Sequence, residues 1–160
     1  MKIMKNAAWI SILFLCFLIA GPLSASDKEK EFKEIGKMGV RELTSRAMDA
    51  IDKKYAGENW EKYKFPKYVY INKSVLAGYR IAVKEPQLLA KFPCYCLCDA
   101  MGHKNLLYCF LEKGVPGGKF DDHASECNIC YTQAMRGFLW NELGASEEEM
   151  QKAMKELYDK

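Results

Sequence analysis

Histidine, the commonest acid–base residue in enzyme active sites, occurs only twice among the 160 residues. The sequence also lacks a glycine-rich phosphate-binding loop, a nucleophile-elbow motif and a paired-carboxylate motif. These absences remove the usual signals for hydrolysis and phosphoryl transfer. The net charge of +3 is too small to drive electrostatic binding of nucleic acid. We therefore expect a protein that is not an enzyme and does not bind nucleic acid.

Long apolar runs are scarce as well, and the main one spans residues 7–20. Its 14 residues follow two lysines and end at Gly-Pro, and they are fewer than the roughly 20 needed to span a bilayer. The small residues of 24–26 suit a signal peptidase. We therefore expect residues 1–26 to be a secretory signal cleaved near Ser26, with loss of Cys16. An uncleaved N-terminal membrane anchor is the alternative, and either form places the protein in the periplasm or cell envelope.

Strand-like alternation is missing from residues 27–160, whereas helical periodicity recurs along them. The expected helices cover 40–56, two short stretches between 72 and 93, 121–144, and a C-terminal stretch. Ser146 and Glu149 form a capping-box pattern at the start of the last one. The pattern predicts an all-α fold, a small single-domain helical bundle. We divide it into an N-terminal helical and aromatic segment, 27–71, and a cysteine-rich helical domain, 72–160.

Six cysteines remain after residue 26, and all of them lie between residues 94 and 130 with both histidines. The candidate metal ligands are Cys94, Cys96, Cys98, His103, Cys109, His123, Cys127 and Cys130. Thiolates with imidazoles suit Cu(I), Zn(II) or an iron–sulfur cluster. The C-x-C-x-C spacing is tighter than that of usual zinc knuckles, which favours Cu(I) as the cofactor.

Backbone periodicity indicates how these side chains meet. In an extended chain, alternate residues point to one side, so the cysteines of 94–98 would share a side. On a helix over 121–144, His123, Cys127 and Cys130 would share a face. We therefore expect the cysteine-rich loop to pack against this helix. The principal ligands would be Cys96, Cys98, Cys127 and Cys130, and the other four candidates would be secondary ligands or a second site.

Two other interpretations of the cysteines stay open. An even number of cysteines in an exported chain is typical of a disulfide framework, and six allow 15 pairings. The framework would serve a non-enzymatic interaction module. The CNIC sequence at 127–130 resembles the C-x-x-C of thiol–disulfide oxidoreductases. In those enzymes the motif lies at a helix N-terminus, whereas the predicted helix begins several residues earlier.

The stretches PCYCLCDAMGHKNLLYC and FDDHASECNIC together resemble the PCYCGC-motif family of bacterial envelope proteins. The resemblance covers about residues 72–158, and all eight candidate ligands match the family pattern by position. Leu97 and Asp99 stand where the family usually has glycine. The resemblance implies an exported, cysteine-rich domain, and it implies no reaction. With the ligand chemistry, it leads us to expect a metal-handling protein that serves an apo-metalloenzyme or an envelope metal-transfer partner.

Overall fold

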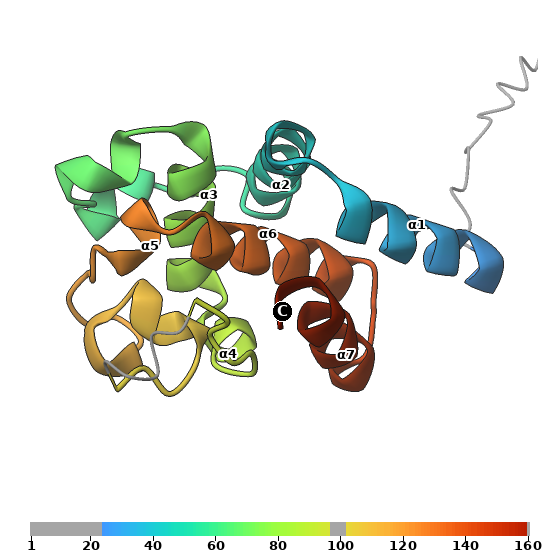
Figure 1. Cartoon of the computed structure of the whole chain (residues 1–160). Coiled ribbons are helices and arrows are strands. Elements are labelled where there is room, and N and C mark those ends of the chain that lie inside the picture. Colours follow the sequence, from blue (N-terminus) through green and yellow to red (C-terminus); the bar gives the residue numbers. More distant parts are fainter. Residues whose placement is uncertain (1–23, 97–101, 160) are drawn as a thin grey trace, which may run out of the picture.

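The computed structural model describes residues 24–96 and 102–159 (Figure 1). The α-helices in these ranges are Ala25–Lys37 (α1), Val40–Lys54 (α2), Lys73–Lys84 (α3), Pro86–Leu89 (α4), His123–Glu126 (α5), Asn128–Glu142 (α6) and Glu147–Tyr158 (α7). The 3₁₀ turns are Trp60–Tyr63 (η1), Lys67–Tyr70 (η2), Leu106–Cys109 (η4) and Glu112–Gly114 (η5). The described ranges contain no strand, only an isolated bridge between Leu111 and Phe120. The predicted all-α fold is confirmed.

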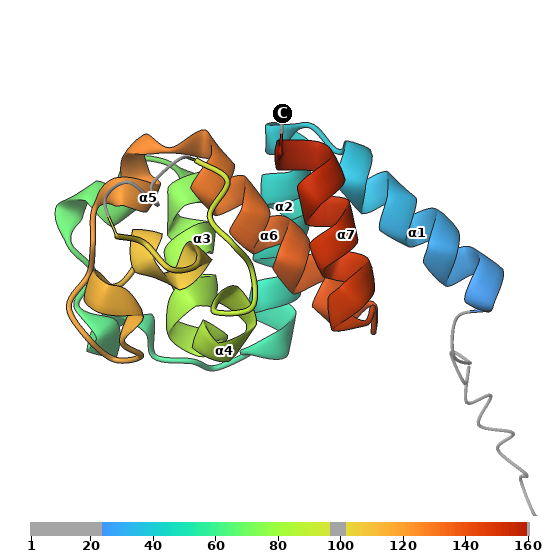
Figure 2. The ribbon, with the colours of Figure 1, turned by 60° about the horizontal axis from the view of Figure 1, so that its bottom comes forward.

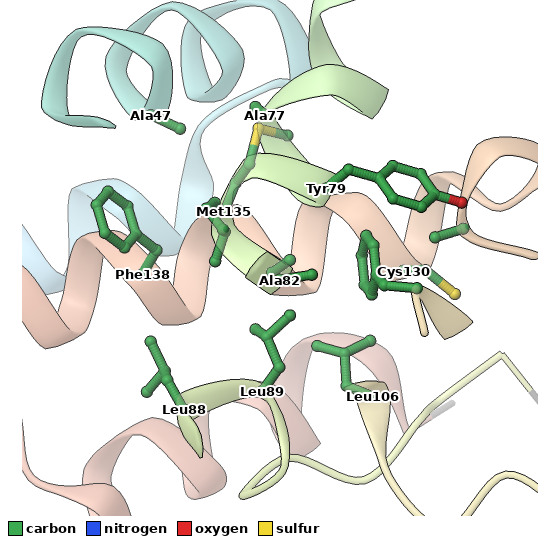
Figure 3. Packing of buried hydrophobic residues seen from close by; sticks show 14 of the residues in the cluster. Ala47, Ala77, Tyr79, Ala82, Leu88, Leu89, Leu106, Cys130, Met135 and Phe138 are labelled. Atoms are coloured by element: carbon green, nitrogen blue, oxygen red, sulfur yellow. The ribbon is translucent and has the colours of Figure 1, made fainter. Parts of the chain in front are cut away.

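Helix α6 is the centre of the bundle. It contacts α1, α2, α3, α4, α5 and α7, and it is apolar around much of its circumference, as expected of a buried helix. Phe138 and Trp140 are fully buried on it. Figure 2 shows α7 lying against α6, with α1 extending away from the other helices. Figure 3 shows Met135 and Cys130 of α6 in one cluster of buried side chains with Tyr79 of α3.

The first two helices form for different reasons. Leu43, Ala47 and Ile51 of α2 are spaced by four residues and are fully buried, which confirms the predicted amphipathic helix. Helix α1 is mostly exposed and depends on its C-terminal half, where Ile35 is buried and Phe32 stacks on Trp140 with ring centroids 4.7 Å apart.

The predicted signal segment falls mainly on residues 1–23, which lie outside the described residues. Within the described ranges, no helix has both the length and the apolar character required to cross a bilayer.

The remaining predicted helices agree with the structure except at one point. Pro86 occupies the first turn of α4, and Ser146 and Glu149 form the expected capping box of α7. The prediction of one continuous helix over 121–144 is wrong. The chain leaves helical geometry at Cys127, with φ −119° and ψ 108°, so α5 and α6 are separate helices.

The aromatic stretch before α3 packs against the body of the protein. Phe65 is 8% exposed and lies 5.2 Å from Phe120 between ring centroids. Trp60 and Tyr63 extend this ring contact, with centroids 5.9 Å apart. Tyr70 is the exception, because it is 57% exposed. Most rings of this stretch therefore pack against the core of the protein.

Candidate metal centre

Four cysteines from three parts of the chain converge on one point. Their Sγ atoms all lie within 4.8 Å of one another, and they belong to Cys94, Cys96, Cys109 and Cys130. We call this set the thiol cluster. The Sγ of Cys94 lies 2.8 Å from that of Cys96 and 3.2 Å from that of Cys109, and the Sγ of Cys130 lies 3.5 Å from that of Cys96. No disulfide joins two of the described cysteines.

Each half of the thiol cluster is placed by different structure. Cys109 ends the 3₁₀ turn η4, which begins where the Asn105 side chain accepts a hydrogen bond from the backbone of Leu107. Cys130 lies in the first turn of α6. Both of these cysteines are fully buried, whereas Cys94 and Cys96 of the preceding loop are half-exposed.

The loop that carries Cys94 is anchored on both sides of Pro93. Phe92 is fully buried, and its carbonyl accepts a hydrogen bond from the backbone of Leu106 at 2.8 Å. Gln133 of α6 is fully buried as well, and its amide donates to the Pro93 carbonyl at 3.2 Å. A buried amide needs such a partner, so this contact fixes the loop against α6. The predicted packing of the cysteine-rich loop against a helix is therefore present.

The structure groups the predicted ligands differently from the expected arrangement. Because the helix breaks at Cys127, His123 and Cys127 do not share a helical face with Cys130. Cys127 is outside the thiol cluster, although it lies close by, and His123 joins a separate group with His103 and Asp121. Cys98 lies outside the described residues. Cys94 and Cys109, predicted as secondary ligands, are members of the thiol cluster.

The second group contains both histidines and one carboxylate. One ligand atom from each of His103, Asp121 and His123 lies within 4.8 Å of the others. The two imidazole rings meet edge to face, with centroids 4.8 Å apart. The two groups adjoin, since Nδ1 of His103 lies 3.4 Å from Sγ of Cys109. Asp121 is a possible ligand that is absent from the eight candidates of the sequence analysis.

Comparison with known families identifies the chain. A family model described as a protein of unknown function with PCYCGC motif matches residues 13–160. The chain belongs to the PCYCGC family. The match extends well beyond the stretch 72–158 that carries the sequence resemblance, so it includes α1 and α2. No curated protein and no solved structure matches the chain.

The stretch PCYCLC, which stands in this chain where the family has PCYCGC, starts at Pro93 and supplies two members of the thiol cluster, Cys94 and Cys96. The other two members come from parts of the chain outside the motif, at η4 and α6. Because sulfur is a soft donor, the cluster could hold a soft or borderline metal ion. The motif alone is therefore half of the candidate metal centre.

The electrostatics of the cluster favour a bound cation. Hydrogen bonding with Cys109, and then with Cys130, holds the pKa of the Cys94 thiol well below its ordinary value. The neighbouring sulfurs of Cys109, Cys127 and Cys94, together with burial, raise the pKa of the Cys130 thiol. Like charges this close cannot all form without compensation, so only some of the four sulfurs ionise alone. A metal ion would supply that compensation.

Cys127 occupies a different position in this PCYCGC protein. It is the N-cap residue of α6 and is half-exposed. The Cys130 thiol, and also the backbone N–H groups of Cys130 and Ile129, lower the pKa of Cys127 to about 6, against the opposing effect of burial. A thiol at the start of a 15-residue helix is an expected place for a thiolate.

An open groove runs beside the half-exposed thiols. Its lining includes Cys94, Cys96, His103 and Cys127, and the C-terminal end of α7 forms the opposite wall at Tyr158. The rings of Tyr95 and Tyr158 stack across it, with centroids 6.4 Å apart. The groove gives solvent and solutes access to the outer sulfurs, while Cys109 and Cys130 lie behind them in the core.

Proposed function

We propose that this protein binds a soft transition metal ion at the thiol cluster and handles that ion as cargo. The observation that carries the proposal is the convergence of four sulfurs from a loop, a 3₁₀ turn and a helix to within 4.8 Å of one another. Each of these four thiols can serve as a thiolate ligand, so the cluster offers a complete set of donors at one point. The donor set contains sulfur alone, which is the chemistry that soft ions prefer.

Copper(I) is the ion we favour. Zinc on four thiolates would set sulfur–sulfur separations of about 3.8 Å, given Zn–S bonds of about 2.3 Å, which the cluster could also meet. Cubane iron–sulfur clusters fit less well, because each cysteine binds a different iron and the sulfurs then stand further apart. Copper(I) is satisfied by two or three thiolates, so the cluster offers more donors than one ion needs. Surplus donors suit an ion that is passed on.

The asymmetry of the cluster supports transfer rather than permanent storage. Cys109 and Cys130 are held rigidly in the core, and Cys94 and Cys96 reach the groove. An incoming ligand can replace the outer sulfurs first while the inner pair keeps the ion. We propose that the receiver is an apo-metalloenzyme or a metal-transfer partner in the cell envelope. The protein would reach that compartment through the secretory signal expected at residues 1–26, and it would not itself be an enzyme.

One observation favours a second candidate function, a thiol–disulfide oxidoreductase. Cys127 stands at the N-cap of α6, half-exposed and with a lowered pKa, and Cys130 lies behind it in the core. The Cys127 thiolate would attack a substrate disulfide and form a mixed disulfide. The Cys130 thiolate would then displace the substrate thiolate, so the protein becomes oxidised and the substrate reduced. A cellular reductant of the dithiol class would restore the protein.

Two matched variants separate these functions. The full chain is expressed in an exporting bacterial host and recovered without added reductant, alongside its Cys109→Ser and Cys127→Ser variants. Copper, zinc and iron are measured by elemental analysis, and free thiols are counted on the denatured protein. Reduction of a protein disulfide such as insulin is measured on the same samples. Circular dichroism checks that each variant is folded.

The proposal expects stoichiometric copper in the native chain and in Cys127→Ser, and a lower copper content in Cys109→Ser, because that variant loses one of the two buried sulfurs that keep the ion. The oxidoreductase alternative expects disulfide reduction that survives in Cys109→Ser and vanishes in Cys127→Ser. Equal loss of metal in both variants would refute the assignment of the thiol cluster. A native chain with neither metal nor free thiols would overturn metal binding altogether and leave the disulfide-stapled interaction module.

A further inference from the structure

We propose that His103, Asp121 and His123 form a second metal site, one for a borderline divalent ion of the Zn(II) class. We call it the histidine–aspartate site. It goes beyond the function proposed for the thiol cluster, because its donors are two nitrogens and one oxygen instead of sulfur. Three such ligands with an open position are typical of sites that bind Zn(II) or Fe(II). The three ligand atoms already lie within 4.8 Å of one another.

Asp121 is held in place by its own backbone. Its N–H donates to the Phe110 carbonyl at 2.9 Å, and its carbonyl accepts a hydrogen bond from the Tyr79 hydroxyl at 2.5 Å. Tyr79 is fully buried on α3, so the position of Asp121 is fixed by the core. A carboxylate fixed in this way is preorganised, and little conformational entropy remains to be lost when it binds an ion.

The Asp121 carboxylate also sets the position of His123. Its Oδ1 accepts a hydrogen bond from the His123 backbone N–H at 3.0 Å and lies 3.1 Å from Nδ1 of the same residue. An ion bound by both residues would replace this contact and take the facing oxygen of Asp121 and nitrogen of His123 as its ligands.

The Asp121 carboxylate supplies negative charge directly beside the His123 ring. The Asp121 side chain has His123 as its ion-pair partner, and that pairing needs a protonated imidazole. A divalent ion would take over this role with both imidazoles neutral.

His103 connects the two sites. Its Nδ1 lies 3.4 Å from Sγ of Cys109, and its ring meets the ring of His123. An imidazole has two nitrogens, so His103 can serve the thiol cluster with one and the histidine–aspartate site with the other. This position predicts that His103→Gln weakens binding at both sites, whereas His123→Gln weakens binding at the second site alone.

The competing explanation is that Asp121 only organises the turn before α5. An asparagine keeps an oxygen that can accept the His123 N–H, so Asp121→Asn would then be harmless. If Asp121 serves a metal ion, the same substitution removes the charge that the ion requires. Asp122→Asn is the matched control, because Asp122 is the adjacent carboxylate and stands outside the group.

The experiment uses the full chain as recovered from the exporting host, reduced and then freed of reductant and metal under anaerobic conditions. Its thiols are saturated with Ag(I), a stand-in for Cu(I) that prefers sulfur. Co(II) is then added as a probe for Zn(II), and binding is measured by equilibrium dialysis with elemental analysis. The Co(II) absorption spectrum reports whether sulfur is among the ligands, since thiolates add charge-transfer bands.

We expect the native chain and Asp122→Asn to bind one Co(II) that lacks thiolate bands. Asp121→Asn and His123→Gln should bind it at least about tenfold more weakly, since even outer-shell partners contribute this much. The inference is overturned if the native chain binds no Co(II), if the bound Co(II) shows thiolate bands, or if Asp121→Asn binds as the native chain does. The same titration on Cys130→Ser, with its thiol cluster disrupted, separates failure of this site from failure of the thiol cluster.

Discussion

Replacing Gly137 with alanine should destabilise the protein, although alanine is the better helix former. Gly137 lies within α6, where a Cβ would stand 2.5 Å from Cε2 of Phe92 and 3.4 Å from Cε of Met154. Phe92 and Met154 are both fully buried, so neither has free space into which to move. Overpacking of this kind costs about 1–3 kcal/mol. The gain in helix propensity, about 1 kcal/mol in a helix interior, offsets only part of that cost.

Gly36→Ala is the matched control, since it makes the same change in α1. A Cβ at Gly36 would lie 3.6 Å from Cζ2 of Trp140 and 3.9 Å from Cδ1 of Leu157, which are ordinary contact distances. Gly36→Ala should therefore leave stability unchanged or raise it. The two variants gain similar helix propensity, so this gain largely cancels when their free energies of unfolding are compared. The difference between them is then the overpacking cost, about 1–3 kcal/mol.

Urea unfolding of the metal-free, reduced chain measures this difference, provided the slope of the transition is the same in both variants. The experiment also probes the metal centre, because Phe92 precedes Pro93 and Cys94. A displaced Phe92 ring should shift the loop and weaken copper binding by Gly137→Ala relative to Gly36→Ala. Equal unfolding free energies for the two variants would refute the packing argument.

The other predictions concern the two ends of the bundle. Ser146→Ala removes the N-cap of α7 and should cost about 1 kcal/mol at neutral pH in urea unfolding. The Ser146 hydroxyl and backbone N–H also donate to the Glu149 carboxylate and lower its pKa. The part of the contribution that comes from the hydroxyl–carboxylate bond is therefore present above the ordinary carboxyl pKa of about 4.3 and is lost as the pH falls through the lowered pKa, whereas the bond from the Glu149 N–H to Ser146 remains. The difference between native and variant should therefore shrink in acid, and a constant difference would contradict the assignment. Trp140→Phe leaves the Phe32 carbonyl without its 2.9 Å donor and should cost about 1–3 kcal/mol, with faster proteolysis of α1 as the specific sign.

Much of the fold could be predicted from local sequence. The four-residue spacing of Leu43, Ala47 and Ile51 specified α2, and the Ser146–Glu149 pair specified the start of α7, because these signals act within one or two turns. Helix α1 is not among the predicted helices, since its stability depends on contacts with Trp140, more than a hundred residues away. A contact between residues so far apart in the chain does not show in the hydrophobic periodicity of the sequence around Phe32.

The candidate site was predicted in composition but not in arrangement. Every described candidate ligand lies in one of the two groups or next to them, as the crowding of thiols and imidazoles indicated. The expected arrangement assumed a continuous helix through Cys127, which the structure does not have, and the ligand assignment itself stays a prediction. The chain that leads into α5 is fixed at Asp121 by the Tyr79 hydroxyl and the Phe110 carbonyl, and these partners leave no local signal in the sequence around the break.

The break at Cys127 also places the thiols of Cys127 and Cys130 in different environments. A continuous helix would place Cys127 and Cys130 on one face as equivalent ligands. With the break, Cys130 turns into the core toward Cys109, and Cys127 stays at the groove as the cap of α6. An ion bound by Cys109 and Cys130 would then have the half-exposed thiol of Cys127 beside it, although Cys127 is not one of its proposed ligands. Such a thiol is placed to take part in exchange, whether the partner brings a metal-binding sulfur or a disulfide.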